Sequence, residues 1–313
     1  MAKTITDARI FLGATDLSGV ANATAINMKT DTVDCTAFSD GMKTKLAGMT
    51  DVIVDVSGYF SPDEDDAMFS KLALADTVLT VATPDGSFGD LAYFFRPTMS
   101  QYTPLDGQVS EVGTFKLHGE GAAPLVRGRV LAAKDARIVT AYETKYNLGA
   151  YTATQYLYGG LHVFTATLGD TLDVTICIAD RVQTITIGAA GTGYTAGHDL
   201  TIVQAGGSFA TANIDTVDGG GGVTGVTLLT PGSGYTVANG LATTVSPGPG
   251  GVDCTLNITA ITDTAVITFT QATASGYEWM TDAGAITDVN FKAKWTIGGA
   301  DPSFTFAVVA GIV

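Results

Sequence analysis

Three histidines, His118, His162 and His198, are the side chains of this sequence best suited to acid–base or metal chemistry near neutral pH. They stand far apart along the chain, and none belongs to an HExxH motif or has a second ligand at the short spacing of a zinc site. We therefore interpret them as ordinary core or surface residues. The sequence predicts neither a metal site nor a catalytic histidine.

Two other segments could carry chemistry but lack the neighbouring residues that this chemistry requires. The glycine-rich run 188–193 is not followed by Gly-Lys-Ser/Thr, so we interpret it as a β-turn rather than a phosphate loop. The acidic run Asp63 to Asp66 lacks the alternating ligands and closing Glu of an EF-hand, which favours a solvated helix start. No Gly-x-Ser-x-Gly nucleophile motif occurs. The sequence therefore predicts no enzyme and no cofactor.

Composition and charge exclude several further classes. The chain has 313 residues and a formal charge of −15, which disfavours a protein that holds nucleic acid through a basic patch. No apolar run approaches the ~20 residues of a membrane span, so we expect no membrane insertion. The first residues have no apolar core of a signal peptide. Cys35, Cys177 and Cys254 are odd in number and widely spaced, so we expect reduced, mostly buried thiols and synthesis in a cytoplasm.

The element pattern is mainly β. Glycine is abundant, at 38 residues, and charged residues make up only 15%. The segment 51–60 alternates Val52, Val54 and Val56 with polar residues, which indicates a half-buried antiparallel strand. One helix is predicted over about 62–74, with Ser61 as N-cap, Glu64 completing a capping box and acids in the first turn.

Three parts are predicted along the chain. Residues 1–150 carry 13 of the 16 basic residues and alternate short strands with the helix. Residues 151–182 and 263–313 contain apolar runs that indicate a second, discontinuous β-sandwich. Between them, residues 183–262 contain 17 of the 38 glycines, four acids and no Lys or Arg. This glycine-rich segment predicts a small β domain inserted into a loop of the second sandwich.

The inserted segment repeats itself. Strand-like residues 182–187 lead to Gly191-Thr192-Gly193-Tyr194-Thr195, and 41 residues later a similar strand leads to Gly232-Ser233-Gly234-Tyr235-Thr236. Two copies of a unit of about 40 residues can cover each other's apolar faces. Tyr194 and Tyr235 could have either of two roles: attachment to host surface glycans, or simple packing beside the glycine turn of each repeat.

The order of motifs over residues 1–135 resembles that of the tail tube proteins of long-tailed bacteriophages. The similar segments are 8–18, 35–40, 46–52, the strand ending in Gly58-Tyr59-Phe60, the acidic helix, Asp85-Gly86 with Gly89-Asp90, and 124–128. The end of the chain, in 286–288, 295–299 and 303–308, resembles the last part of some long phage tail proteins. The Gly-x-Gly-Tyr-Thr repeats resemble glycine-rich modules of phage virion proteins.

This resemblance implies a fold and a function. The fold would be a tail-tube-like β-barrel or sandwich with one short helix, extended here by the second sandwich and the inserted repeat domain. The protein would be a virion tail component, assembled in the host cytoplasm. Its copies would form rings, six per ring rather than three, that stack into a tube and contact other phage tail proteins. Viral DNA would pass through an acidic lumen without specific binding.

The resemblance also implies where copies touch. The loop between the paired strands, about 39–49, would reach the next ring, with Asp40, Lys43 and Lys45 as charged residues and Met42, Leu46 and Met49 as apolar anchors. Two other classes of function stay open from the residues alone. One is a different virion component, such as a capsid decoration or tail-tip protein. The other is an extracellular carbohydrate-binding β protein.

Overall fold

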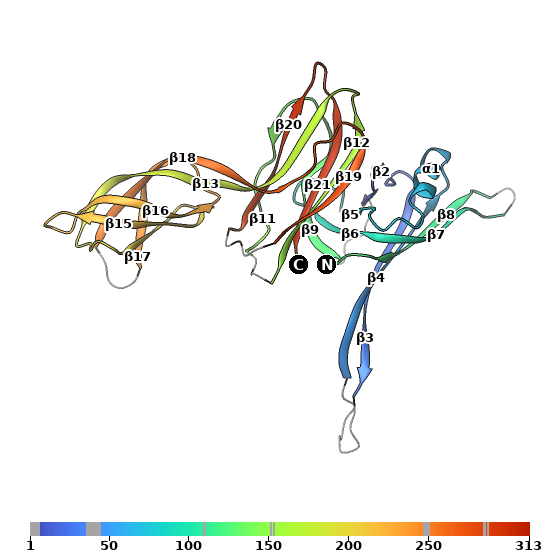
Figure 1. Ribbon diagram of the computed structural model, residues 1–313, viewed down its shortest axis with the longest axis horizontal. Helices are drawn as coiled ribbons and strands as arrows, with labels where there is room; N and C mark the ends of the chain where they lie inside the picture. The colour runs from blue at the N-terminus through green and yellow to red at the C-terminus, as the bar shows by residue number, and fades with distance from the viewer. Residues whose placement is uncertain are drawn as a thin grey trace.

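The computed structural model describes residues 7–35, 45–108, 111–150, 152, 154–246, 251–283, 286 and 288–313. These residues form 21 strands and one helix, arranged in three sheets, so the protein is mainly β as predicted. Figure 1 shows an elongated molecule with a central body and a two-stranded arm that projects near one end of the long axis. Residues 183–246 and 251–262, here called the module, lie at the other end.

The body is built around an eight-stranded antiparallel sheet, here called the central sheet. Its strands, in spatial order, are β19 (Gly276–Ala283), β12 (Tyr156–Ala166), β21 (Phe304–Ile312), β9 (Val126–Arg137), β6 (Leu91–Phe95), β5 (Leu79–Thr83), β1 (Arg9–Leu12) and β2 (Thr15–Asp16). Strands from both sides of the predicted boundary at residue 150 therefore share one sheet. The three-part division made from the sequence stays an interpretation.

The central sheet curls until strands from its two ends meet. His162 on β12 lies 2.7 Å from the Thr80 hydroxyl on β5, although three strands stand between β12 and β5 in the sheet. The same ring lies 2.6 Å from the Gly13 carbonyl oxygen in the turn between β1 and β2. The enclosed face is filled by apolar residues of β5, β6, β9 and β21, including Phe94, Val130 and Val309.

A four-stranded sheet, here called the arm sheet, covers one flank of the central sheet. Its order is β3 (Ala21–Asp34), β4 (Lys45–Tyr59), β8 (Thr114–Gly121) and β7 (Pro97–Asp106). Val52, Val54 and Val56 are buried against β1 and β5, which confirms the predicted alternation. The alternate positions of β4, including Asp51, Asp55 and Ser57, lie on the opposite face of the sheet, which is polar.

The helix is shorter than predicted and is capped differently. It spans α1 (Pro62–Ser70) and not 62–74, because the chain turns after Lys71. Ser61 has an extended backbone, but its side chain makes no capping bond to the described helix. Met68 is fully buried, whereas Phe69, Leu72 and Leu74 are exposed. Met68 therefore inserts into the core, whereas the other three apolar side chains of this segment face outward.

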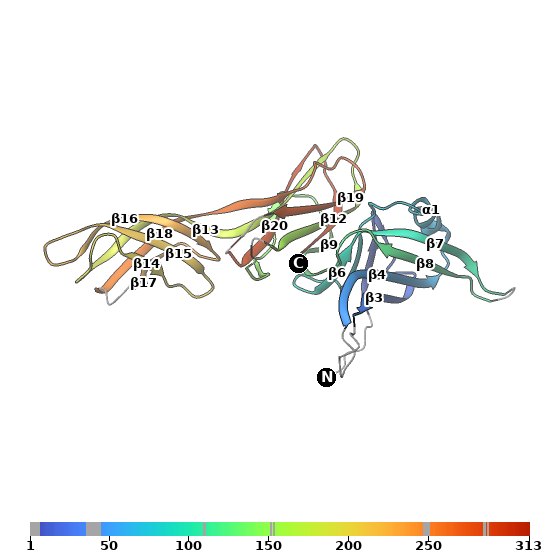
Figure 2. The same ribbon diagram turned by 60° about the horizontal axis from the view of Figure 1, so that its bottom comes forward.

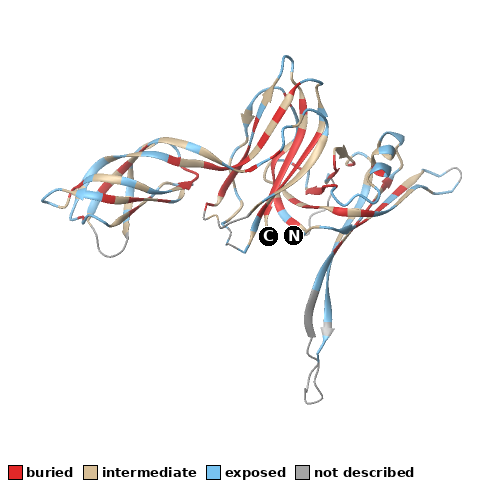
Figure 3. Ribbon diagram, in the orientation of Figure 1, coloured by how far each residue is buried: buried red, intermediate tan, exposed pale blue. Residues whose placement is uncertain are grey.

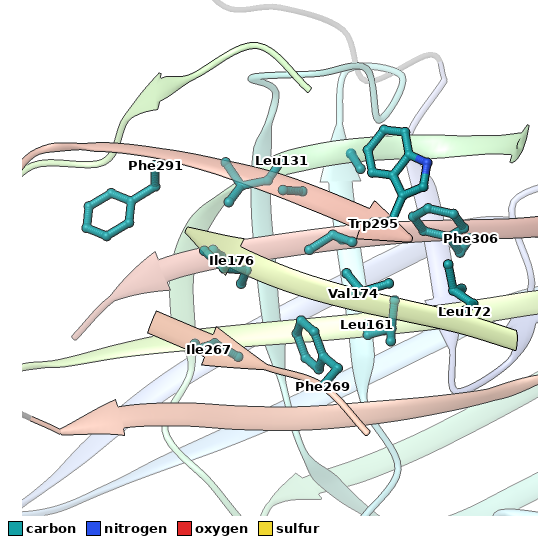
Figure 4. Close-up of a cluster of buried hydrophobic side chains, with 14 of the residues drawn as sticks. Leu131, Leu161, Leu172, Val174, Ile176, Ile267, Phe269, Phe291, Trp295 and Phe306 are labelled. Atoms are coloured by element: carbon teal, nitrogen blue, oxygen red, sulfur yellow. The ribbon is translucent and has the colours of Figure 1, made fainter. Parts of the chain in front are cut away.

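A nine-stranded sheet, the long sheet, covers the other flank and continues beyond the body. It contains β10 (Ala141–Tyr142), β20 (Asn290–Gly298), β13 (Thr171–Thr192), β18 (Val252–Thr268), β17 (Ala238–Ser246), β14 (Asp199–Ile202), β15 (Ser208–Val217) and β16 (Val223–Ser233), with β11 (Tyr146–Asn147) beside β20. In the body, Ile176, Phe291 and Trp295 pack on Leu161 and Phe306 of the central sheet (Figure 4).

Strands β13 and β18 leave the body together and become part of the module, as Figure 2 shows. Beyond them the sheet curls until β16 packs against β13 and encloses a separate apolar core that includes Leu200, Ile214 and Ile258. Figure 3 shows that buried residues concentrate in the body, whereas the described part of the arm is exposed. The module therefore rests on two continuous strands and not on a flexible linker.

Candidate functional site: the arm sheet and its open edges

The arm sheet has two strands without an outer neighbour. Among the described strands, β3 pairs with β4 and β7 pairs with β8, so each presents one row of unpaired backbone groups. Open edges of this kind are templates for pairing with another chain. A sheet open on both sides can add one copy at each edge, which is the requirement for closing a ring.

The β7 edge is accessible only in part. Pro104 has no backbone N–H, and the Ala73 amide already donates to the Met99 carbonyl oxygen at 2.8 Å. Between these two positions, residues 100–103 are left for pairing. Tyr102 is fixed there by its hydroxyl, which donates to Asp65 of α1 at 2.6 Å; burial and this bond raise the pKa of the phenol.

A groove of about 640 Å³ runs beside the other edge, between β1 and the first residues of β3. Polar side chains at its rim include Asp7, Arg9 and Asp85, and Arg9 donates to the Asp85 carbonyl oxygen. The groove continues the open edge of β3 onto the body. A chain that paired with β3 would therefore also find a concave polar surface.

The arm is the part of β3 and β4 that extends beyond β8. Pairing of β4 with β8 stops at Ile53, whereas β3 and β4 stay paired to Asp34 and Lys45. The arm exposes two large apolar side chains, Met28 at 60% and Met49 at 86%. Both side chains are accessible to another chain.

The solvent-facing side of the arm sheet carries mixed charge with a surplus of acid. Carboxylates of Asp51, Asp55, Asp106 and Glu120 stand against the ammonium groups of Lys29 and Lys116. His118 lies between two of the acids, with Nδ1 2.7 Å from Asp55 and Nε2 3.8 Å from Glu120. The surplus of acidic over basic side chains on this face is small. A chain with a formal charge of −15 would be expected to have a more acidic face.

The predicted contact loop is only partly described. Asp40, Met42 and Lys43 lie outside the described residues, and of Lys45 and Leu46 only the backbone in β4 is described. Met49 is the predicted contact residue whose side chain is described, and it is exposed. The role of the loop stays a prediction, to which the structure adds Met28 on the facing strand.

Tyr194 and Tyr235 are buried, so the surface role considered for them does not fit their positions. Tyr235 is fully buried; its hydroxyl accepts from the Ala210 amide and donates to the Ile202 carbonyl, each at 3.1 Å. Tyr194 is 5% exposed and accepts from the Cys254 amide. The alternative, packing beside the glycine turn of each repeat, is what the structure has.

Sequence reasoning missed a charged cluster where the module joins the body. Lys292 of β20, only 6% exposed, bridges Asp180 of β13 at 3.0 Å and Asp263 of β18 at 2.8 Å. Burial lowers the pKa of the Lys292 ammonium group, but its bonds to the two carboxylates outweigh burial and raise the pKa. Lys145 reaches both Asp180 and the Gly234 carbonyl oxygen of the module.

A signal for this cluster was present in the sequence. The three basic residues beyond position 150 are Arg181, Lys292 and Lys294, and all three take part, with Arg181 facing Asp288 at 3.8 Å. Scarce charges that recur beside apolar strand residues indicate specific pairing. Their partners could not be deduced, because the strands come from separate parts of the sequence; Lys292 and Asp180, for example, are 112 residues apart.

The positions of the histidines and cysteines indicate no metal-binding cluster among the described residues. His162 is fully buried. Cys177 and Cys254 are buried and Cys35 is exposed, which agrees with the expectation that the thiols are mostly buried. Within the described ranges, no group of three or more His, Cys, Asp or Glu side chains could hold a metal ion. No helix in that part of the chain is long and apolar enough to cross a membrane.

Comparisons with known proteins show only low similarity in sequence and in structure. No family model matches the sequence, and no curated protein matches it. A chain from the virion of a native gene transfer agent particle is 20% identical, with a TM-score of 0.34, and the match covers 40% of this chain and 98% of that one.

Two further solved structures are similar at the same level. A chain from the tail of an empty gene transfer agent particle with C6 symmetry is 18% identical, with a TM-score of 0.30 over 38% of this chain and 94% of that one. The SPP1 Dit protein, described as a hub adsorption apparatus of phages that infect Gram-positive hosts, is 10% identical, with a TM-score of 0.28 over 98% of this chain and 100% of that one. No residue role is transferred from these chains.

Proposed function

We propose that this protein is a structural subunit of a bacteriophage tail tube. The observation that carries the proposal is the arm sheet: four strands with an open edge on each side and a long arm extending from one end. It is formed by residues 21–121, within the segment 1–135 whose motif order resembles tail tube proteins. A subunit of this shape can join neighbours on both sides and reach a further copy along the axis.

Ring closure would pair the β3 edge of one copy with residues 100–103 of β7 in the next. Repeated around the ring, this contact makes one continuous barrel and removes every exposed edge of the arm sheets. The groove beside β3 would receive the part of the neighbour next to β7, where Phe69 of α1 and, after the helix, Leu72 and Leu74 are exposed. We propose six copies per ring.

The solvent-facing side of the arm sheets would then line the lumen. Its surplus of carboxylates over ammonium groups repels phosphates weakly, and no basic cluster appears among its described side chains. Duplex DNA could therefore slide past without being held. The module lies at the opposite end of the long axis from the arm sheet, which would put it on the outside of the tube (Figure 1).

Negative-stain microscopy of the purified chain tests the proposal. We expect hollow tubes of stacked rings, and averaged cross-sections should show six-fold symmetry with the module density outermost. Isolated rings that bind other tail proteins but never stack would favour a tail-tip role instead. Monomers at every concentration, with affinity for glycans on an array, would contradict a virion role and support the carbohydrate-binding alternative.

A further inference from the structure

A pocket of about 190 Å³, here called the arginine pocket, lies between the central sheet and β11. Arg127 and Arg129 of β9 line it on one side, and Tyr146, Asn147 and Leu148 line it on the other. Side chains alternate along a strand, so the two arginines, two positions apart, point to the same face of β9. At ~30 Å³ per water molecule the pocket has room for about six waters, and therefore for a small oxyanion with a few carbon atoms.

Neither arginine of this pocket has an acidic partner among the described residues. Other basic side chains of the chain form ion pairs with carboxylates, namely Lys29, Lys116, Lys134, Arg137, Lys145, Arg181, Lys292 and Lys294. Asp90, which precedes the pocket residue Leu91, instead accepts from the Ser87 amide at 2.9 Å. Two like charges on one face of a strand repel each other, and a bound anion removes this repulsion.

Arg129 is held in position before any ligand binds. Its guanidinium group lies 5.5 Å from the centre of the Tyr146 ring and donates to the Gly89 carbonyl oxygen at 3.3 Å. Tyr146 is itself fixed by Phe88, whose ring centre lies 6.0 Å away. Only one N–H of Arg129 is used in this way, so its other donors are available to a ligand. Binding therefore costs little side-chain entropy at this residue.

The remaining lining supplies a further donor and an apolar surface. Oδ1 of Asn147 accepts from the Gly149 amide at 2.9 Å, which orients the side-chain amide and leaves Nδ2 as a donor. Leu91, Leu148 and Ile312 form the apolar part of the lining. This combination suits a ligand with a charged head and a short carbon chain.

The charge of the two arginines favours a phosphate group over a carboxylate. Each guanidinium group is always charged, and its planar fork matches the oxygens of both anions. A phosphate monoester carries about −1.5 to −2 charges at pH 7 and compensates both arginines. A carboxylate carries a single negative charge and would leave one arginine uncompensated.

We propose that the arginine pocket binds the phosphate group of a small phosphate ester. The phosphates of duplex DNA share this chemistry, but each carries a single negative charge on a stiff backbone, which fits a pocket of this size less well. The site goes beyond the tail tube function and does not depend on it. A ligand held by β9 and β11 together would tie β11 to the central sheet and so stabilise the body.

Isothermal titration calorimetry of the full chain tests the site, with inorganic phosphate, glycerol 3-phosphate and acetate as probes. We expect one phosphate or glycerol 3-phosphate per chain, and acetate to bind roughly tenfold more weakly or worse. Glycerol 3-phosphate should also raise the thermal midpoint of unfolding. Its affinity should fall as the pH drops below ~6, where the phosphate group takes up its second proton.

Variants of Arg127 show whether the phosphate occupies this pocket. Arg127 is exposed, so Arg127→Gln should stay folded, which its thermal midpoint without ligand checks, and should bind glycerol 3-phosphate roughly tenfold more weakly. Arg127→Lys keeps the charge but loses the fork, and its affinity should lie between the two. The control is Lys71→Gln, which removes the same charge outside the pocket, where Lys71 lies 4.7 Å from the centre of the Tyr277 ring. Its affinity should equal that of the wild type.

Three results would overturn the inference. Equal affinities of Arg127→Gln and the wild type would show that phosphate binds elsewhere. Acetate binding as tightly as phosphate would contradict the choice of a phosphate group. A short DNA duplex that displaces glycerol 3-phosphate, and whose own binding is lost in Arg127→Gln, would make the pocket a nucleic-acid contact. None of these measurements requires tube formation, so their outcome is independent of the tail tube proposal.

Discussion

His162 is the residue in which the curling of the central sheet is most visible. A carbonyl oxygen only accepts hydrogen bonds, so Nδ1 must carry the proton that it shares with Gly13, and Nε2 accepts from the Thr80 hydroxyl. The neutral ring therefore satisfies both contacts. Burial lowers the pKa of His162 from its ordinary 6.5 to about 4, against smaller raising effects of the Gly13 bond and Asp16.

This shift predicts a loss of stability in acid. The unfolded chain takes up the proton near pH 6.5 and the folded protein only near pH 4, so the stabilisation is complete above pH 6.5 and lost as the pH falls toward 4. The change amounts to about 3 kcal/mol. Tryptophan fluorescence, with Trp279 packed beside Phe94, should report unfolding midpoints that fall over this range.

His162→Gln separates this effect from the titration of the carboxylates. Glutamine can still donate and accept in the same site but does not titrate. We expect the variant to be less stable than the wild type at pH 7.5 and to lose less stability on going to pH 4. Parallel pH profiles for the two proteins would show that His162 is not the responsible group.

The repeat glycines predict a second residue-level effect. Gly232 has φ +57°, and an added Cβ would lie 2.2 Å from the Ser208 carbonyl oxygen and 2.5 Å from the Ala210 nitrogen. Gly232→Ala should therefore destabilise the module by about 2 kcal/mol or more, through backbone strain and displacement of β15. Gly219→Ala is the matched control, since its Cβ would meet no described atom within 4 Å. Hydrogen exchange of residues 208–235 should be faster in the first variant and unchanged in the second.

At the scale of elements, the junction of β13 and β18 with β20 decides how the module is held. Lys292 touches both strands that carry the module, and its ammonium group also lies 4.5 Å from the centre of the Tyr142 ring. Removing one member of a buried ionic group leaves the others without compensation, at a cost of about 3 to 5 kcal/mol. Orientation of the module should therefore depend on Lys292 more than on any exposed lysine.

Lys292→Met tests this dependence. We expect small-angle scattering to show a wider range of overall dimensions, and limited proteolysis to cleave faster near Asp180 and Asp263. Lys294→Met is the control, because Lys294 is 46% exposed and lies 3.9 Å from Asp263. Equal scattering profiles for Lys292→Met and the wild type would mean that strand pairing alone fixes the module.

Local sequence patterns predicted individual strands and the helix better than they predicted the contacts that these elements make with the rest of the chain. The alternation of Val52, Val54 and Val56 identified β4, because period two is a property of one strand. The predicted capping box at Ser61 failed, and the helix stopped at Ser70 because Ala73 pairs with the edge of β7. The curling that brings His162 to Thr80 joins residues 82 positions apart, and no local pattern encodes such a contact.

In the candidate site, too, some features could be predicted from the local sequence and others depend on the fold. Met49 was predicted as a contact from its neighbours in sequence, whereas the exposure of Met28 became visible only when strand pairing placed this residue opposite Val52. Burial of Tyr194 and Tyr235 could have been favoured from their positions after glycine turns. Their hydroxyl partners, the Cys254 and Ala210 amides, come from strands that only the fold brings near.

At the scale of the whole molecule, the module should be dispensable for assembly. Val182 pairs with Ile261, so an Asn-Gly turn between these residues would replace 183–260 without moving either strand. Val182→Thr in the same chain limits the apolar surface that the deletion exposes. We expect tubes with an unchanged lumen and a smaller outer diameter, measured by cross-section averages of stained particles.

The deletion also has a clear contrary result. A shortened chain that folds, judged by its thermal midpoint, but no longer assembles would show that the module belongs to the assembly contacts. Wild-type averages with module density inside the channel would contradict its outer placement. The second result would also contradict the proposed position of the arm sheet at the lumen.

The continuity of β13 and β18 determines how the module would respond to mechanical load. Hydrogen bonds in an antiparallel sheet lie perpendicular to the strands, so a pull along β13 stresses its bonds to β20 simultaneously, in shear. Bonds loaded in this way must break together, whereas a pull across the strands would open them one after another. Drag on the module, directed along its two strands, is therefore transmitted to the body with little extension, and the same force applied sideways would peel the junction apart.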